Sequence, residues 1–374
     1  MRPSPPRRPS KRPRTHVSRP SVIGGGGRRY VNSGASCRLW QVPVVSASLR
    51  TENGRLRFPL RLFWNDAERR PRAAVRILVA VLGVLVLANT ARTYQPTLFP
   101  GTGPVADVWN TLSSGLPQSL AIAAGVCLAA VVLDRRRLTD LGFPLDGNGR
   151  RFVGGTALGA SITAGSVGVG LLAGYYDLTG IRLTHGLGTW LLLVVGTISS
   201  QLGIVVAEEL FARGYLITNV LEGLDGVPSL PRAATAAVAI GVAALFFVLT
   251  HSVRGTTFAV MAGGLAVLFG VAYVLTGDLT APIGIHFGVN AAGMLCGTAP
   301  QPASLLELSA TSTVADSLVL PADAVVVRLL AAAGSVVVLL WWHASHSDHD
   351  WVTPALAQPT LRHHTDDTSD QPHD

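Results

Sequence analysis

Two adjacent glutamates, Glu208 and Glu209, stand at the end of a long apolar run, and Arg213 follows one helical turn later in the stretch AEELFARG. Ionisable side chains in or against a membrane are energetically costly, so by default they mark a functional site. On a helix, residues four positions apart share a face, whereas adjacent residues point about 100° apart. The spacing therefore predicts an ion pair between Glu209 and Arg213. Glu208 then faces elsewhere, without a basic partner close in sequence, and its carboxylate is free for chemistry.

Two histidines and one asparagine lie in later apolar segments. His251 follows Phe247 by four residues in the stretch LFFVLTH, and His286 precedes Asn290 by four in TAPIGIHFGVN. A single histidine in such a segment is usually a packed or hydrogen-bonded residue, but strongly polar groups in hydrocarbon must find one another. We therefore predict one inward-facing cluster that contains Glu208, His251, His286 and Asn290.

This cluster could hydrolyse an amide bond in two ways. An apolar site disfavours the charged form of a carboxylate and makes it a stronger base, so Glu208 could take a proton from water. The histidines and Asn290 could then bind the oxyanion or orient the water. Alternatively, Glu208, His251 and His286 could hold Zn²⁺, which would acidify the water itself. The zinc motif HExxH is absent from the sequence, so no cofactor is certain, and zinc is the one that these residues suggest.

The elements that must position these residues are apolar helices. Only 14% of the 374 residues are charged, against about 25% in soluble domains, so the composition is that of a membrane protein. A helix that spans a bilayer needs about 20 residues. Apolar segments of about that length recur at 73–91, 116–133, 152–174, 188–207, 233–251, 257–275, 280–297 and 324–342. We therefore predict an all-α polytopic membrane protein with about eight transmembrane helices and disordered N- and C-terminal tails.

Charge is distributed unevenly along the chain. Residues 1–76 hold 18 of the 30 basic residues and 3 of the 22 acidic ones. We predict a disordered basic tail at 1–55, a membrane domain at 56–345 and a disordered, acidic, histidine-containing tail at 346–374. The basic tail has the composition of a solvated segment, so no specific nucleic-acid partner is predicted.

Arginines also predict the orientation of the chain in the membrane. They precede the first apolar segment and lie between the second and the third, whereas the connections after the first and the third hold one arginine each. Loops rich in arginine and lysine stay on the cytoplasmic side. The N-terminus is therefore predicted to be cytoplasmic, and with eight spans so is the C-terminus of this multi-pass cell-membrane protein.

The predicted cluster sets a condition on the depth of its residues. Glu208 follows the inner end of segment 188–207, and His251 lies at the outer end of segment 233–251. These ends would be separated by most of the ~30 Å hydrocarbon thickness. The helix that carries Glu208 must therefore continue inward, and we expect it to run through Leu216.

Three short motifs occur in order: EExxxR at 208–213, FxxxH at 247–251 and HxxxN at 286–290. Together they resemble the CAAX protease and bacteriocin-processing family of intramembrane endopeptidases, also called the Abi or type II CAAX prenyl endopeptidase family. The stretch LGFP at 141–144 is similar to that family's lead-in. Each motif alone is weak, but three in order, each in or beside an apolar segment, are specific. The resemblance covers residues 56–345.

The resemblance implies about eight spanning helices around a catalytic cavity within the membrane. It implies that Glu208 activates water, with Glu209 and Arg213 as the partner acid and basic residue. The water, the oxyanion or a metal would be held by His251, His286 and Asn290. The substrate that it implies is a peptide or a membrane-anchored protein in the lipid bilayer, with or without a prenylated cysteine in a C-terminal CaaX sequence.

Other chemistries have less support in the sequence. A serine protease needs a nucleophile in a GxSx setting, which Ser252 lacks. An aspartyl protease would offer YD and GxGD motifs, but TGD at 276–278 follows Leu275 where the first glycine belongs, and this aspartate and that of YYD at 175–177 fall in predicted loops. The remaining rival is a transporter, or a non-catalytic binding or immunity factor, that uses the same cluster. The completeness of the three motifs favours the protease.

Overall fold

The computed structural model describes residues 63–65, 68–94, 101–143, 149–182, 186–225, 227–314, 318–346, 351–358 and 361. Contacts divide the chain into two units, Met1–Glu52 and Asn53–Asp374, and the described residues all belong to the second unit. The predicted tail at 1–55 lies outside the described residues, as does most of the predicted tail at 346–374.

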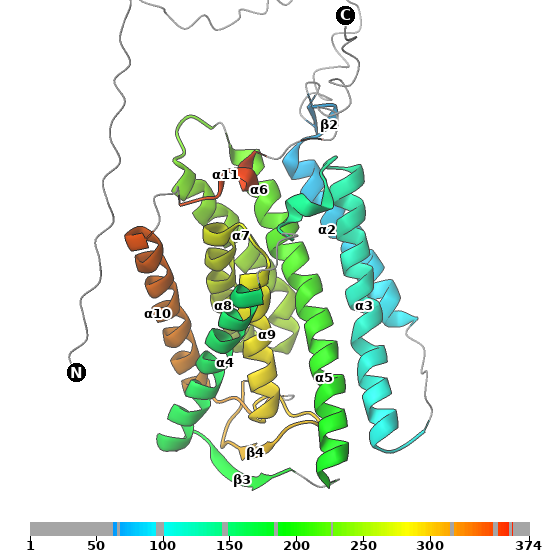
Figure 1. Ribbon diagram of the computed structural model, residues 1–374, viewed down its shortest axis with the longest axis vertical. Coiled ribbons are helices and arrows are strands. Elements are labelled where there is room, and N and C mark those ends of the chain that lie inside the picture. The colour runs from blue at the N-terminus through cyan, green and yellow to red at the C-terminus, as the bar shows by residue number, and fades with distance from the viewer. Residues whose placement is uncertain are drawn as a thin grey trace, which may run out of the picture. The chain divides into compact units, whose positions relative to one another are not determined.

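Seven helices in the described part of the chain are long and apolar enough to cross a membrane. They are α2 (Ala73–Thr93), α3 (Pro104–Val132), α4 (Gly149–Leu172), a long helix that starts with α5 (Gly186–Glu209), α7 (Arg232–His251), α8 (Thr256–Thr276) and α10 (Ala322–His346). The eighth predicted segment forms a shorter helix, α9 (Thr280–Leu295). The prediction of an all-helical, polytopic membrane protein with about eight helices is confirmed (Figure 1).

α9 has 16 residues, fewer than the roughly 20 that a membrane span needs. It packs along α4 through glycines. A Cβ atom at Gly159, Gly284 or Gly288 would collide with the backbone of the facing helix, so only glycine permits this close approach. His286 is two residues from Gly284 and two from Gly288, so it lies on the opposite face of the helix. There its ring stacks on Phe269 of α8.

The helix that carries the two glutamates continues well beyond the predicted end of its segment. α5 passes into η2 (Leu210–Ile217), a π-helical segment, and then into α6 (Thr218–Leu224), as one helical run. The expectation that this helix runs through Leu216 is confirmed. Hydropathy ends the predicted segment at its first charged residues, although every residue of η2 is buried.

α3 begins at Pro104 rather than at residue 116. Gly103, with a φ of 111°, precedes it, and proline suits the first turn of a helix. The polar stretch WNTLSSG lowers the hydropathy here and makes the predicted helix too short. The hydroxyls of Ser113 and Ser119 donate to carbonyls of the preceding turn, which satisfies them within the helix.

α8 lies at the centre of the helices. In its most apolar window 72% of the residues are buried, against 22–39% in the other six candidate spans. α7, α9 and α10 contact α8, and α4 packs against both α9 and α10. The outer helices expose large apolar side chains, for example Leu87, Leu172, Val195 and Leu330. Lipid tails are as apolar as leucine, so such faces suit a bilayer.

Two small antiparallel sheets join the helices. β1 (Trp64–Asn65) pairs with β2 (Arg70–Pro71) just before α2. β3 (Asp177–Ile181) pairs with β4 (Leu306–Ser309). Because β3 follows α4 and β4 precedes α10, the second pair ties the connection between α4 and α5 to the connection between α9 and α10.

Short helical turns complete the described structure. η1 (Leu138–Leu141) follows α3, and η3 (Ser252–Arg254) follows α7. α11 (Pro354–Ala357) contacts α6, and Val352 and Leu356 are buried in the core. Part of the segment predicted as a C-terminal tail therefore packs against the helix that carries the glutamates.

Candidate active site

A π-helical segment follows the two glutamates directly. η2 occupies Leu210–Ile217, and π-helical turns are rare and are frequently found at functional sites. Gly214 lets η2 approach η1 closely, because a Cβ atom there would stand 2.8 Å from the carbonyl oxygen of Leu141. The LGFP stretch thus packs against the segment that contains Arg213, although its Pro144 lies outside the described residues.

The ion pair expected from the spacing forms between Glu209 and Arg213. Arg213 Nη1 donates to Glu209 Oε1 at 2.8 Å, and both side chains are fully buried. Arg213 Nη2 also donates to the carbonyl oxygen of Ala266 on α8 at 3.0 Å. Its guanidinium lies 4.5 Å and 5.2 Å from the ring centres of Phe247 and Phe269, a cation–π arrangement. Arg213 therefore fixes η2 against α7 and α8.

His286 joins the first motif to the third. Its Nδ1 lies 2.8 Å from Glu209 Oε1, and its Nε2 lies 3.7 Å from Glu208 Oε2. An ionised carboxylate can only accept hydrogen bonds, so Nδ1 of His286 carries a proton, and this N–H donates a hydrogen bond to Glu209. Nε2 is then turned toward Glu208, whose side chain is 29% exposed. The sequence spacing pairs Glu209 with Arg213 alone. The contact between Glu209 and His286 was missed because the two residues are 77 positions apart.

His251 lies at the end of α7, on the same cavity as His286. Its Nδ1 is 2.9 Å from the carbonyl oxygen of Phe247 and 3.2 Å from Thr250 Oγ1. Its ring stacks on Phe247, with ring centres 5.3 Å apart. Glu208 and His286 act on it electrostatically. The FxxxH spacing thus has a physical role, because Phe247 orients the His251 ring through both its carbonyl and its side chain.

Asn290 also lines this cavity, one turn beyond His286. Its Nδ2 donates to Gln201 Oε1 at 3.4 Å. Gln201 lies on α5, two turns before Glu208, and it is a site residue that the sequence analysis missed. The signal was present, because Gln201 is the only amide side chain in the apolar run 188–207.

The cavity that these residues share has a volume of about 160 Å³ and is lined from α5, α7, α8, α9 and α10. Among the described residues that line it there is no Asp or Glu, and its charged groups are Arg254 and Arg328. Glu208 contacts His286 without being part of the lining. The structure thus brings Glu208, Glu209, Arg213 and His286 into one contact group, with His251 and Asn290 on the adjoining cavity.

The predicted zinc ligands Glu208, His251 and His286 do not group as a metal site. In the part of the chain that the structure describes, no set of three or more His, Cys, Asp or Glu side chains is arranged to hold a metal ion. Nδ1 of His286 faces Glu209, and Nδ1 of His251 faces a backbone carbonyl, which are contacts that a zinc-ligating histidine can also make. Zinc therefore stays a prediction, and the mechanism proposed for this protein does not use it.

The residues of the rival chemistries have structural partners. Asp278 Oδ2 pairs with Arg151 at 2.9 Å, and Asp278 Oδ1 accepts from the backbone N–H of Thr280 at 2.6 Å at the start of α9. Ser252 Oγ donates to the carbonyl oxygen of Leu249 at 2.8 Å. Asp278 therefore holds a helix end, as expected of a turn residue.

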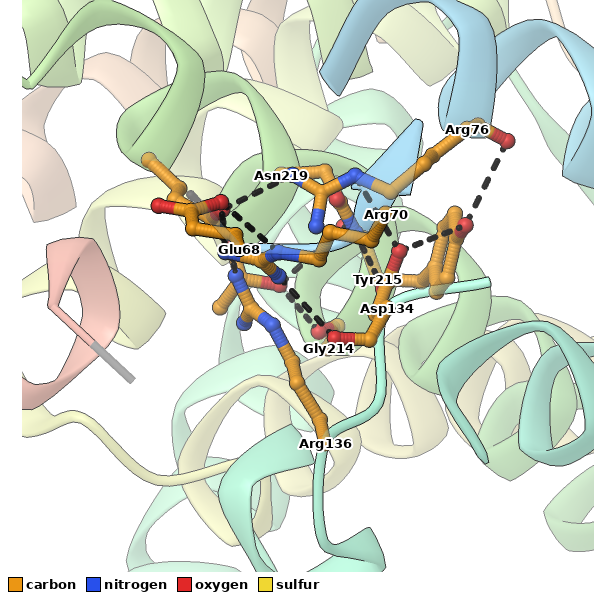
Figure 2. Close-up of polar contacts among 10 residues, drawn as sticks. Glu68, Arg70, Arg76, Asp134, Arg136, Gly214, Tyr215 and Asn219 are labelled. Carbon is orange, nitrogen blue, oxygen red and sulfur yellow. Dashed lines mark hydrogen bonds and ion pairs between the residues drawn. The ribbon is translucent and has the colours of Figure 1, made fainter. Parts of the chain in front are cut away.

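A second cluster of buried charges lies at the far end of the same helix (Figure 2). Glu222 on α6 accepts hydrogen bonds from three arginines that are at most 2% exposed, namely Arg70, Arg76 and Arg136. Asp134 lies beside them, 3.4 Å from Arg76 Nε, and accepts from Asn219 Nδ2 at 2.9 Å. We call these three arginines with Glu222 and Asp134 the arginine network.

The arginine network ties the end of the glutamate-bearing helix to β2, α2 and the connection after α3. Tyr215 of η2 joins it, since its hydroxyl lies 3.4 Å from Asp134 Oδ1. Arginines that the sequence analysis assigns to loops on one side of the membrane are in part buried here. The network therefore fixes the helix below the two glutamates.

Comparison with known proteins agrees with the motifs. Residues 188–292 match the family model of the type II CAAX prenyl endopeptidase Rce1-like family. This segment is therefore similar to a family of CAAX proteases, which supports the resemblance carried by the three motifs. The matched segment runs from α5 to α9 and contains all six predicted site residues, from Glu208 to Asn290. No curated protein and no solved structure matches the chain. The chain is therefore a multi-pass membrane protein with a segment that is similar to a protease family.

Proposed function

We propose that this protein is an intramembrane endopeptidase that hydrolyses a peptide bond with water activated by Glu208. One observation carries the proposal: His286 turns one ring nitrogen to Glu209 at 2.8 Å and the other to Glu208 at 3.7 Å. The second distance is too long for a direct hydrogen bond, and a water that bridges Nε2 and Oε2 would be suitably placed. That water is the nucleophile.

The chemical step needs one proton carrier. Glu208 takes a proton from the bridging water as the water oxygen bonds to the carbonyl carbon of the substrate, and the carbonyl electron pair moves onto its oxygen. When this tetrahedral intermediate collapses, the C–N bond breaks and Glu208 returns the proton to the leaving nitrogen. The products are a carboxylic acid and an amine, and Glu208 is again ionised.

The negative charge on the intermediate needs hydrogen-bond donors. Asn290 lines the cavity beside His286, and we assign its amide N–H to the oxyanion. His251 lines the same cavity, but its Nδ1–H is engaged by the Phe247 carbonyl, so we assign its Nε2 to accepting a hydrogen bond from water or substrate. Asn290 lies in a partly enclosed site with mostly apolar walls, where such interactions are stronger than in water. Removing one oxyanion donor typically costs about 10²–10³-fold in kcat.

Glu209 and Arg213 act as positioning residues. Glu209 Oε1 accepts from both Arg213 and His286, so it sets the His286 tautomer that leaves Nε2 facing Glu208. Arg213 in turn holds Glu209 through a buried ion pair and is itself held by Ala266 of α8. Positions of this kind determine whether the reacting groups keep their geometry.

The substrate is a peptide or a membrane-anchored protein that reaches the cavity from the bilayer. Cleavage beside a prenylated cysteine is the specificity that the family description names, and we propose it as one of two classes, the other being unprenylated peptides. We also propose that both termini are cytoplasmic, because arginines gather in the connections before α2 and before α4.

The test compares wild type with Glu208→Gln in membranes of a host that lacks the gene, with new peptide termini mapped by mass spectrometry. The substitution keeps the size of the side chain and removes the base. Glu307→Gln is the matched control, since Glu307 on β4 is an exposed carboxylate that pairs with Arg182. We expect new termini with wild type and the control, and none with Glu208→Gln.

Two outcomes would contradict the proposal. If new termini persist in Glu208→Gln membranes, Glu208 is not the base. If wild type produces a phenotype without any new termini, the cluster binds or transports instead of cutting, which is the non-catalytic reading of the same residues.

A further inference from the structure

Arg328 is a buried cation on the membrane-crossing helix α10, and it is 4% exposed. Its Nε donates to Ser166 Oγ on α4 at 3.2 Å, and its Nη1 lies 3.9 Å from Met261 Sδ on α8. Within the described residues its Nη2 is buried and has no hydrogen-bond partner. A charged group in such a place is expensive unless it has a function.

The surroundings of Arg328 supply no counter-charge. The titratable groups that act on it electrostatically are Tyr176 and Cys296. Burial raises the pKa of Tyr176 to about 12, so this phenol is neutral at physiological pH. Arg213, the other fully buried arginine near the cavity, has Glu209 at 2.8 Å. Among the described residues Arg328 therefore lacks the carboxylate partner that Arg213 has.

Arg328 lines the cavity that also contains His286 and Asn290. The described lining contains no acidic residue, so Arg254 and Arg328 are the charged groups among the described residues that line it. The remaining walls are largely apolar, and they include Phe258, Leu265, Phe269, Val289 and Met294. A cavity with a cation among apolar walls suits a ligand that carries a carboxylate next to apolar groups.

We propose that Arg328 binds a carboxylate of the substrate in the cavity where the peptide bond is hydrolysed, and so determines specificity. The proposal rests on the function proposed above. The carboxylate is either the C-terminus of the peptide or an acidic side chain. The planar guanidinium offers paired N–H groups to a carboxylate, and Nη2 is the donor left for it.

The contacts of Arg328 argue against a purely structural role. A long basic side chain near a helix end can extend its charge into water, but Arg328 stays buried with the head group inside. Ser166 and Met261 hold the guanidinium from two other helices without neutralising it. The arrangement keeps the charge in place and leaves its neutralisation to a ligand.

Binding is measured on the full-length Glu208→Gln protein in lipid nanodiscs, so that no probe is cut. The probes are acetyl-Ala-Val-Leu with a free carboxylate, the same peptide as its carboxamide, and acetyl-Ala-Asp-Leu carboxamide. Each is tested with Arg328 retained, with Arg328→Met and with Arg328→Lys. Arg182→Met is the matched control, because it removes an exposed arginine on the β3–β4 side of the molecule.

A carboxylate is expected to improve binding by about 10- to 100-fold over the amide, the range for hydrogen bonds to charged groups. Arg328→Met should abolish this preference and leave amide binding unchanged, whereas Arg182→Met should keep it. Arg328→Lys should restore part of the preference for the carboxylate, because lysine supplies the charge without the paired N–H groups of arginine. A preference for the free terminus assigns the carboxylate to the peptide end, and a preference for the aspartate probe assigns it to a side chain.

The unfolding midpoint distinguishes ligand binding from a structural role, because loss of a structural residue would lower it. Arg328→Met removes a buried charge without a carboxylate partner, so its unfolding midpoint should not fall below that of the parent. If Arg328→Met does not fold, the comparison between Arg328 and Arg328→Lys decides. Equal affinity for acid and amide probes with Arg328 present overturns the proposal, and so does displacement of the peptide by oleate, which would assign the site to a lipid.

The binding assay and the test of the proposed function can fail independently of each other. The binding assay uses protein whose base has been removed, so an absence of proteolysis in wild type does not affect it. If wild type cuts the acid and amide peptides with equal kcat/KM, the specificity assignment fails while the protease stands.

Discussion

The helix from Gly186 to Leu224 carries buried charges at two places, and the two differ in what they leave unpaired. In the arginine network, the unsatisfied atoms are donors, on Arg76 and Arg136. Around the glutamates, Arg213 Nε is a buried donor without a hydrogen-bond partner among the described residues, but Glu209 Oε2 is also a buried acceptor without one, and Glu208 reaches His286 only at 3.7 Å.

The difference corresponds to two roles of a buried carboxylate, which can stabilise the fold or act as a base. In the arginine network three guanidinium groups surround one carboxylate, so Glu222 has little capacity left to accept a proton. In the candidate active site two carboxylates share two donor residues, Arg213 and His286, and Glu209 Oε2 has no partner among the described residues, so acceptor capacity remains for water. A buried carboxylate surrounded by donors stabilises a fold, whereas one with a free lone pair can act as a base.

Glu209→Gln should have the largest effect, because Glu209 both neutralises the buried Arg213 and orients His286. The substitution leaves Arg213 as a buried charge without its carboxylate, which costs about 3–5 kcal/mol of stability. It also removes the acceptor that sets the His286 tautomer, so kcat should fall along with the unfolding midpoint. Thermal unfolding and peptide cleavage measured on the same preparation would show the two losses. A stable but inactive variant would mean that Arg213 needs no counter-charge.

Glu222→Gln should lower stability alone. It leaves three buried guanidinium groups around a neutral amide, and breaking a buried ion pair costs about 3–5 kcal/mol. The folded fraction should retain its kcat, because Glu222 lies more than three turns beyond Glu208 on the same helix. Unfolding in nanodiscs and turnover per folded molecule separate the two quantities, with Glu307→Gln as the control. A fall in kcat per folded molecule would show that the arginine network also affects the candidate active site.

Asn290→Ala should do the reverse, lowering activity with little change in stability. Asn290 is half-buried, and its 3.4 Å bond to Gln201 is long, so little folding energy depends on it. Loss of an oxyanion donor should reduce kcat by about 10²–10³-fold, with KM nearly unchanged. Steady-state kinetics on a fluorogenic peptide measures this split. A change in KM alone would make Asn290 a substrate-binding residue.

Much of this arrangement is predictable from local spacing. The i,i+4 pair of Glu209 and Arg213 follows from helix geometry alone, and the continuation through Leu216 follows from the need to bring Glu208 to the depth of the histidines. The helix count also follows from hydropathy. These features depend on periodicity and on the cost of charge in hydrocarbon, both of which can be read from a single segment.

The remaining features depend on contacts between distant segments. The bond from His286 to Glu209, the bond from Asn290 to Gln201 and the burial of Arg136 each require knowledge of which helices pack together. Hydropathy also misjudges helix ends, because a serine-rich turn such as that of α3 satisfies its own hydroxyls. Arginine-rich connections predict orientation, but they do not reveal that three of the arginines converge on Glu222.

Asp134 gives the smallest and most discriminating prediction, since it lies in the arginine network beside Glu222. Burial raises the pKa of Asp134 above its ordinary value, against the opposing attraction of Arg76. Its folded pKa therefore exceeds its unfolded one, which is about 3.9. The stability that this group contributes is fully present below the unfolded pKa and is lost as the pH rises through the folded pKa.

Asp134→Asn should therefore change stability at neutral pH by less than about 1 kcal/mol, since a neutral side chain there avoids the desolvation that Asp134 suffers. The variant should also lose part of the acid-side pH dependence of the unfolding midpoint, measured between about pH 4 and pH 7. Glu222→Gln, measured in parallel, should remain several-fold more damaging. If the two substitutions cost the same, the charge of Asp134 is as fully compensated as that of Glu222. The arginine network would then hold two equivalent carboxylates, and its difference from the active site would lie in Glu208 alone.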